Sequence, residues 1–143
     1  MSRGAHKYPI PPFMSDLGFT QNTYGTWLDR ITIAHSVRDN SRLGTKVNRE
    51  AYRTAIHDAV CRSNGRDAYT NEPLDFRLLE HFAGAPVVGR SEEETPTLDH
   101  VVLHPTKPVF AICSLRTNKC KADLTVPELI DFARKFLTFQ KEI

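Results

Sequence analysis

The sequence predicts an α+β fold in which helices come first, two short strands follow and a helix ends the chain. Three observations carry this prediction. Apolar residues recur at helical spacing in the first half, two short apolar runs separated by prolines follow, and helical spacing returns at the end. With 143 residues, of which 40% are hydrophobic, the chain has the size of one modest core. We therefore expect residues 1–143 to form a single domain.

The first part of the chain divides into an arm and two helices. Residues 1–22 are rich in proline and lack periodicity, which predicts an extended arm. Residues 23–66 hold two helical patterns, one from Tyr24 to about Arg42 and one that begins at an Asn48 cap and ends near Gly65. The predicted buried stripes are Trp27, Leu28, Ile31, Ala34 and His35 in the first helix, and Ala51, Tyr52, Ala55, Ile56, Ala59 and Val60 in the second.

Residues 67–124 carry shorter elements. The segment Asp67–Leu74 has the aromatic and asparagine pattern of a tight turn, and Leu78–Phe82 is predicted to form a short helix. Gly89–Pro96 contains three successive glutamates and is predicted to be an exposed loop. Two strands, Leu98–Leu103 and Val109–Ile112, are expected on either side of a proline-containing loop.

Residues 125–143 predict a C-terminal helix. Thr125 and Glu128 have the spacing of a capping box. Its expected buried face consists of Leu129, Ile130, Ala133, Phe136 and Leu137.

Basic residues are concentrated in the helical region near the N-terminus. Between Arg30 and Arg66 there are eight Lys or Arg residues and three acidic residues. Such an excess suits a phosphate backbone, and we expect Arg49 and Arg53 to contact nucleic acid. A solvated helix face with salt-bridging partners explains the same charges equally well.

The cellular setting follows from what the sequence lacks. No apolar run has the length of a membrane span, and the first residues lack the apolar core of a signal peptide. The three cysteines form no CxxC pair and fit a reducing compartment, where we expect them to be inert packing residues. A soluble, cytoplasmic protein without a membrane partner is therefore predicted.

One group of residues has the composition of a hydrolytic site. Asp99 and His100 lie on the first predicted strand, and Asn118 falls about one turn into a helical segment after the second. A strand, strand, helix unit can bring all three together. Histidine is suited to deprotonating water near neutral pH, and a carboxylate with an amide oxygen can hold Mg²⁺, which keeps several waters.

These residues resemble the HNH, or His-Me finger, nucleases, whose core reads as an acidic residue and a histidine on a strand and then Asn-x-x-Lys on a helix. Here those residues are Asp99, His100, Asn118 and Lys121. The resemblance covers about Asp67 to Lys121. It implies a ββα-metal core in residues 67–124, with Asp99 and Asn118 as ligands of one Mg²⁺ or Mn²⁺. It also implies that His100 is the general base of an endonuclease that hydrolyses DNA, expected to be double-stranded.

Two features depart from the family pattern. Many members hold a structural zinc with two CxxC pairs, but the corresponding positions here are Asp67, Thr70, Ser114 and Thr117. Because zinc requires nitrogen or sulfur ligands in such closed sites, no structural zinc is expected, and hydrogen bonds must hold the hairpin. The middle Asn of the family motif also has no clear match between His104 and Val109.

Other polar residues are weaker candidates. Three basic residues surround Asn118 in the sequence and are predicted to bind the phosphate backbone, namely Lys121, Arg116 and Lys119. His57 and His81 are expected at the margin of the core or in solvent, and His104 in a loop near the site.

Alternatives remain open from the sequence alone. Asp99 could simply orient His100 while Asn118 caps a helix. The chain could then be a non-catalytic nucleic-acid-binding module that retains the HNH fold, or a protein-interaction domain. The sequence does not decide between DNA and RNA as the substrate, and it does not give the oligomeric state.

Overall fold

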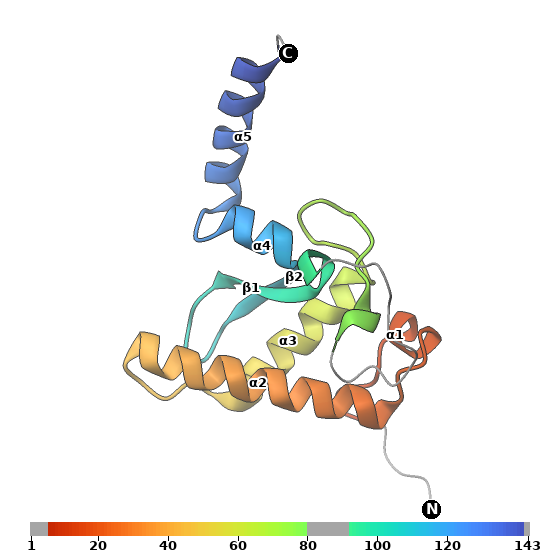
Figure 1. Ribbon diagram of the computed structural model, residues 1–143. Coiled ribbons are helices and arrows are strands. Elements are labelled where there is room, and N and C mark those ends of the chain that lie inside the picture. The colour runs from red at the N-terminus through yellow and green to blue at the C-terminus, as the bar shows by residue number, and fades with distance from the viewer. Residues whose placement is uncertain (1–5, 80–91, 142–143) are drawn as a thin grey trace, which may run out of the picture.

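The computed structural model describes residues 6–79 and 92–141 (Figure 1). Within these ranges the protein combines helices with one two-stranded antiparallel sheet, which confirms the predicted α+β class. None of the described helices has the length and hydropathy needed to cross a membrane.

The N-terminal segment is only partly the extended arm that was predicted. Residues 12–16 form the short helix α1 (Pro12–Asp16), which begins at a proline, a residue favoured in the first helical turn. Its Met14 side chain is fully buried in the core. The extended conformation predicted for the arm was therefore wrong for residues 12–16, whereas the burial of Met14 agrees with an arm that packs on the body.

Helix α2 (Gln21–Leu43) is the longest element. Thr20 and Thr23 form a capping box at its start, and Gly44 ends it in the left-handed conformation (φ 64°). The buried face contains Trp27, Leu28 and His35 as predicted, whereas Ala34 is exposed. The other buried residues of the helix are Tyr24 and the polar residues Thr32, Ser36 and Asp39.

Helix α3 (Arg49–Ser63) follows the prediction closely. The Asn48 side chain accepts a hydrogen bond from the Ala51 backbone, and the helix ends at Asn64 in the left-handed conformation, one residue before the expected Gly65. All six residues of the predicted stripe are buried or half-buried. The helix packs against α2 on one side and the sheet on the other (Figure 1).

A turn and two short 3₁₀ helices connect α3 to the sheet. The turn predicted at residues 67–74 is confirmed, since Asn71 takes the left-handed conformation (φ 62°) and the Asp67 backbone N–H donates to the Glu72 carbonyl. Of the helix expected at residues 78–82, residues 80–82 lie outside the described residues, and the 3₁₀ helix η1 (Phe76–Leu78) ends at Leu78. The second 3₁₀ helix, η2 (Glu92–Glu94), falls in the predicted loop, whose first residues also lie outside.

The sheet is a hairpin of β1 (Pro96–Val102) and β2 (Val109–Ser114), close to the two predicted strands. Asp99 pairs with Ala111 and His100 with Phe110, and the register shifts between His100 and Val102. Helix α4 (Leu115–Lys121) begins directly after β2. The core lies between this hairpin and helices α2 and α3, and its largest fully buried side chains are Tyr24, Tyr52, Phe76 and Phe110.

Helix α5 (Val126–Gln140) has the predicted capping box of Thr125 and Glu128. Its predicted buried face is wrong, because no residue of the helix is buried. The helix instead projects from the rest of the protein (Figure 1). The helix is amphipathic as predicted, but no described part of the chain covers its apolar face.

Candidate active site

A pocket of about 400 Å³ lies where α2, β1 and α4 meet. Strand β1 supplies Asp99 and His100, and α4 supplies Asn118, so the structure brings together the three residues expected at the site. Helix α2 adds two arginines, Arg38 and Arg42, for which the sequence pattern predicted no role at the site. The complete lining consists of Arg38, Arg42, Leu98, Asp99, His100, Asn118, Ala122 and Asp123.

The Asp99 carboxylate is buried and held by one of its oxygens. Its Oδ2 accepts a hydrogen bond from the Tyr69 hydroxyl and lies 3.0 Å from the Lys121 ammonium. Burial and this hydrogen bond together raise the pKa of Tyr69, so its hydroxyl stays protonated and keeps donating. No described residue hydrogen-bonds to Oδ1. The carboxylate is thus fixed in place with one oxygen left for a ligand.

Asn118 is fixed in a comparable way. Its amide nitrogen donates to the Thr97 hydroxyl and to the Leu98 carbonyl, each over 3.1 Å. These bonds leave the Oδ1 atom without a partner among the residues described. The side chain that caps α4 belongs to Ser114, so Asn118 does not have the capping role considered as an alternative.

His100 is oriented by a residue that sequence reasoning missed. Its Nε2 lies 2.8 Å from Oδ2 of Asp39, a fully buried residue of α2. The Tyr52 hydroxyl donates to the same oxygen over 2.6 Å. A carboxylate can only accept hydrogen bonds. Asp39 therefore favours the tautomer of His100 that carries its proton on Nε2 and has a lone pair on Nδ1.

Asp39 therefore has the orienting role that one alternative had given to Asp99. A sequence signal for it existed, because Asp39 follows His35 by four residues and shares the buried face of α2. An acidic residue on a buried helix face usually has a partner, and here that partner is a histidine from another element.

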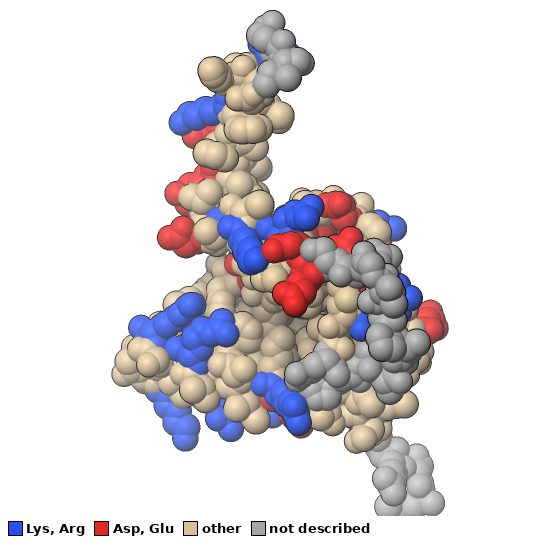
Figure 2. Space-filling model, in the orientation of Figure 1, with Lys and Arg blue, Asp and Glu red and all other residues tan. Residues whose placement is uncertain are grey.

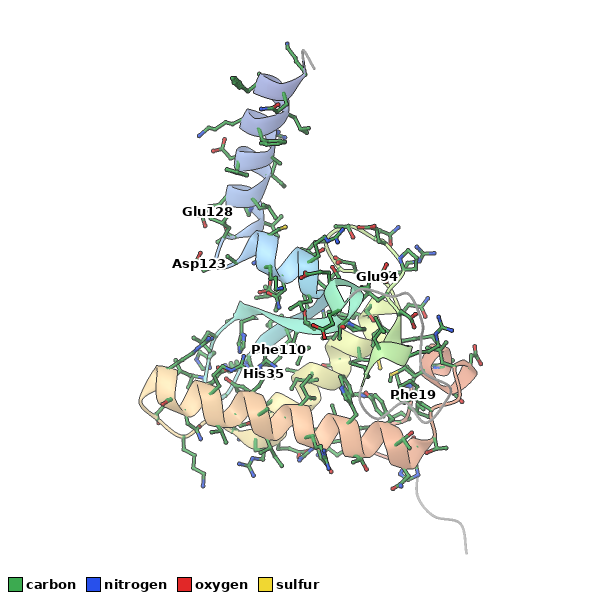
Figure 3. The ribbon with its side chains drawn as sticks, in the orientation of Figure 1. Phe19, His35, Glu94, Phe110, Asp123 and Glu128 are labelled. Atoms are coloured by element: carbon green, nitrogen blue, oxygen red, sulfur yellow. The ribbon has the colours of Figure 1, made fainter. Side chains whose placement is uncertain are left out.

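Two rings fix the plane of the His100 imidazole. Its centroid lies 4.9 Å from that of Phe110 and 5.3 Å from that of His35. Figure 3 shows His35 and Phe110 between α2 and the hairpin. Burial, with a smaller contribution from His100, lowers the pKa of His35 to about 4. His35 is therefore neutral at pH 7 and adds no positive charge beside His100.

The positive charge at the pocket comes from α2. Arg38 and Arg42 are exposed and one helical turn apart, and both line the pocket. Figure 2 shows Lys and Arg side chains gathered over the C-terminal part of α2. Two guanidinium groups therefore line the same pocket as Asp99 and His100.

The basic residues singled out from the sequence lie elsewhere. Arg53 pairs with Asp29 and Glu50, which fits the alternative of a solvated, salt-bridged helix face. Arg49, Arg53, Arg116, Lys119 and Lys121 are all absent from the lining of the pocket.

The three basic residues of α4 have acidic neighbours. Lys119 pairs with Glu93 over 2.8 Å, and Arg116 lines a separate pocket that also contains Glu93 and Glu94. Lys121 is buried against Asp99, a position in which it fixes the carboxylate and does not face solvent as a backbone contact would.

The other described histidines and the cysteines do not line the pocket. His57 is buried at the margin of the core and contacts the Tyr24 hydroxyl, as expected, and His104 is an exposed loop residue whose Nδ1 accepts backbone N–H groups. His81 lies outside the described residues. Of the cysteines, only Cys113 is a buried packing residue, so that expectation was wrong for Cys61 and Cys120, which are exposed.

The four positions that the resemblance aligns with zinc ligands of HNH nucleases form a hydrogen-bonded cluster. The Asp67 carboxylate accepts from the backbone N–H groups of Tyr69, Thr70 and Ser114. The Ser114 hydroxyl in turn caps α4 by accepting from the Thr117 N–H. Burial alone raises the pKa of Asp67, but these hydrogen bonds outweigh it and lower the pKa below its ordinary value. Hydrogen bonds are thus present at these positions, where hydrogen bonds and packing were expected to hold the hairpin.

The residues at the pocket fit a divalent cation of the Mg²⁺ type. Asp99 and Asn118 each offer one oxygen that no described residue hydrogen-bonds, and Mg²⁺ is commonly held by one or two protein oxygens and several waters. Among residues 6–79 and 92–141 there is no group of three or more His, Cys, Asp or Glu side chains suited to a metal. The candidate set therefore consists of one carboxylate and one amide.

Comparisons with known proteins give no further guidance. No protein-family model, no curated protein and no solved structure matches the chain.

Proposed function

We propose that the protein is a metal-dependent endonuclease with a ββα-metal core of the HNH kind, which hydrolyses phosphodiester bonds in DNA. The observation that carries this proposal is the convergence of Asp99, His100 and Asn118 on one pocket beside Arg38 and Arg42. The order of β1, β2 and α4 along the chain supports it, because it is the order that the resemblance implies.

His100 is the general base in this proposal. Its Nδ1 takes a proton from a water molecule, whose oxygen attacks phosphorus as the bond to the leaving oxygen breaks. Asp39 holds the ring through Nε2 and stabilises the imidazolium that forms, as a buried carboxylate does beside other catalytic histidines. The leaving oxygen then takes a proton from solvent.

Asp99 and Asn118 would hold a divalent cation through their Oδ1 atoms, which no described residue hydrogen-bonds. A bound Mg²⁺ or Mn²⁺ neutralises charge on the scissile phosphate and on the leaving oxygen. Tyr69 and Lys121 keep the Asp99 carboxylate in place through Oδ2 and are positioning residues. This role replaces the backbone contact expected of Lys121.

Arg38 and Arg42 bind the phosphates that flank the scissile bond. A guanidinium group suits this task because it presents several N–H donors in a planar fork that matches phosphate oxygens. Both side chains stand on one helix beside the base and the ligands, which fixes the strand relative to His100.

The proposal is tested by incubating the purified protein with supercoiled plasmid and, separately, with a structured RNA, in Mg²⁺ and in excess chelator. We expect nicked and linear plasmid in Mg²⁺ and none with chelator. Retention of plasmid without cleavage, with Mg²⁺ or Mn²⁺ present, would instead identify a non-catalytic binding module. Cleavage of RNA alone would overturn the assignment to DNA.

A further inference from the structure

A second pocket, of about 360 Å³, lies between the C-terminal end of α3, the turn at residues 67–74 and strand β2. Its lining includes Arg62 and Arg66, which belong to the basic excess of the N-terminal half but lie outside the candidate active site. We call it the arginine pocket. Among the described residues that line it, Asp67 is the only acidic one, so the two guanidinium groups dominate its charge.

Backbone carbonyls hold both guanidinium groups without neutralising their charge. Arg62 donates to the Phe110 carbonyl of β2 over 3.1 Å, and Arg66 donates to the Asn71 carbonyl over 2.9 Å. Within residues 6–79 and 92–141, no carboxylate pairs with either arginine. Because a guanidinium group has five N–H donors, each arginine is oriented by the protein and still has donors and a full charge for a ligand.

The hydrogen-bond acceptors of the arginine pocket are already engaged with the protein. The Asp67 carboxylate accepts from three backbone N–H groups, and the Ser63 hydroxyl both donates to the backbone and accepts from it. The Tyr69 hydroxyl donates to Asp99. The capacity left for a ligand is therefore mainly that of positively charged N–H donors, which suits an anion with several oxygens, such as a phosphate group.

The arginine pocket adjoins the candidate active site through one cross-strand pair. Ala111 lines the arginine pocket, and its partner on β1, Asp99, lines the pocket that contains His100. The Cβ atoms of such paired residues lie about 5 Å apart. Tyr69 joins the same two places, because it lines the arginine pocket and donates to Asp99. A nucleic-acid strand carries a phosphate at every nucleotide, so one strand can occupy both pockets.

We propose that the arginine pocket is a second phosphate site, in which Arg62 and Arg66 bind the backbone of the nucleic acid a short distance from the bond that is cut. The choice of a nucleic-acid phosphate rests on the proposed function. A free phosphate ion has the same chemistry, but the cross-strand link to Asp99 favours a phosphate that belongs to the substrate. Such a contact positions the strand and carries no sequence information.

Fluorescence anisotropy of a short labelled DNA duplex, in excess chelator to prevent cleavage, tests the site. Arg62→Gln with Arg66→Gln should weaken binding about tenfold and reduce the slope of log K against log salt by about 2, as expected for the loss of two charges at phosphates. Arg62→Lys with Arg66→Lys keeps the charges and should retain most of the slope. Thermal unfolding confirms the fold, since Arg62 also binds the Phe110 carbonyl.

Arg49→Gln with Arg134→Gln is the matched control. Both arginines are exposed, and neither lines the arginine pocket, so the control removes the same charge from elsewhere on the protein. It should alter binding and the salt slope much less. Equal effects of the two Gln double variants, or unaltered binding by Arg62→Gln with Arg66→Gln, would overturn the proposal.

Nitrogen NMR of the wild type gives a second test that needs no substitution. Adding the duplex in chelator should shift the guanidinium Nε resonances of Arg62 and Arg66, and inorganic phosphate should shift them only at much higher concentration. Resonances that do not move with the duplex, or that saturate first with inorganic phosphate, would overturn the nucleic-acid site.

Plasmid cleavage in Mg²⁺ separates this proposal from the proposed function. A protein that cleaves plasmid but binds the duplex independently of Arg62 and Arg66 would overturn the arginine pocket alone. A protein that binds the duplex through these arginines and does not cleave would overturn the nuclease and support the phosphate site.

Discussion

The Nε2 atom of His100 lies 2.8 Å from Oδ2 of Asp39, although 61 residues separate them in the sequence. The contact joins β1 to α2 and determines which ring nitrogen carries the proton. Because Asp39 also accepts from Tyr52 of α3, one buried carboxylate links three elements of the fold at the proposed base.

Asp39→Asn should reduce DNA cleavage about 10- to 100-fold while leaving Mg²⁺ affinity unchanged. The amide keeps the shape of the carboxylate but can present its N–H to His100, which favours the wrong tautomer. The rate, its pH profile and metal affinity should be measured together. Asp29→Asn, on the exposed side of α2, is the control, and an Asp39→Asn protein with an unaltered rate and pH profile would exclude the orienting role.

Asp99→Asn should strongly weaken Mg²⁺ binding because it removes the only charged ligand. Asn118→Ala should weaken it less, since a neutral amide contributes less attraction. His100→Ala should bind Mg²⁺ as the wild type does. Calorimetric titration of the three proteins, with thermal unfolding to confirm the fold, measures these differences, and equal affinities for Asp99→Asn and wild type would remove Asp99 from the ligand set.

Arg38→Ala with Arg42→Ala should weaken DNA binding and reduce the slope of log K against log salt by about 2, as expected for the loss of two phosphate contacts. Arg49→Ala with Arg53→Ala removes the same charge away from the pocket and is the matched control. Its smaller effect is expected because Arg53 already pairs with Asp29 and Glu50. Equal slopes for the two double variants would show that position beside the pocket is irrelevant to binding.

Asp67→Asn should destabilise the protein by about 2 kcal/mol, because it disturbs a buried acceptor of three backbone hydrogen bonds. The folded-state pKa of Asp67 lies below the ordinary value of 3.8. Its contribution to stability is therefore present above that value and is lost as the pH falls through the lower, folded-state pKa.

Urea unfolding of wild type and Asp67→Asn at several pH values measures this effect, with the exposed Asp58→Asn as control. The difference between wild type and Asp67→Asn should shrink as the solution is acidified below pH 3.8. A difference that stays constant with pH would show that Asp67 acts through shape alone.

Local signals predicted most of the elements. The Asn48 cap, the Thr125 and Glu128 capping box and the left-handed Asn71 each depend on neighbouring residues, and the structure has all of them. The apolar face of α5 was also recognised correctly as a pattern. The prediction that this face is buried was wrong, because a periodic pattern identifies an apolar face without identifying what covers it.

The site was predictable only in part for a similar reason. Asp99, His100 and Asn118 lie within one strand, strand, helix unit, so their order along the chain sufficed to group them. Arg38 and Arg42 line the pocket from α2, and Asp39 of the same helix contacts His100. The packing of α2 against the hairpin depends on tertiary contacts that no local spacing records. Charge density along the sequence indicated Arg49 and Arg53 as nucleic-acid contacts. It does not show which basic residues line the pocket, and these two do not.

The initial rate of plasmid cleavage by His100→Ala in saturating Mg²⁺ tests the central claim most directly. The substitution removes the proposed base but none of the proposed metal ligands. We predict a rate about 10²- to 10⁴-fold below that of the wild type, the usual effect of losing a general base, with Mg²⁺ affinity unchanged. Cleavage by His100→Ala at the wild-type rate would contradict the account.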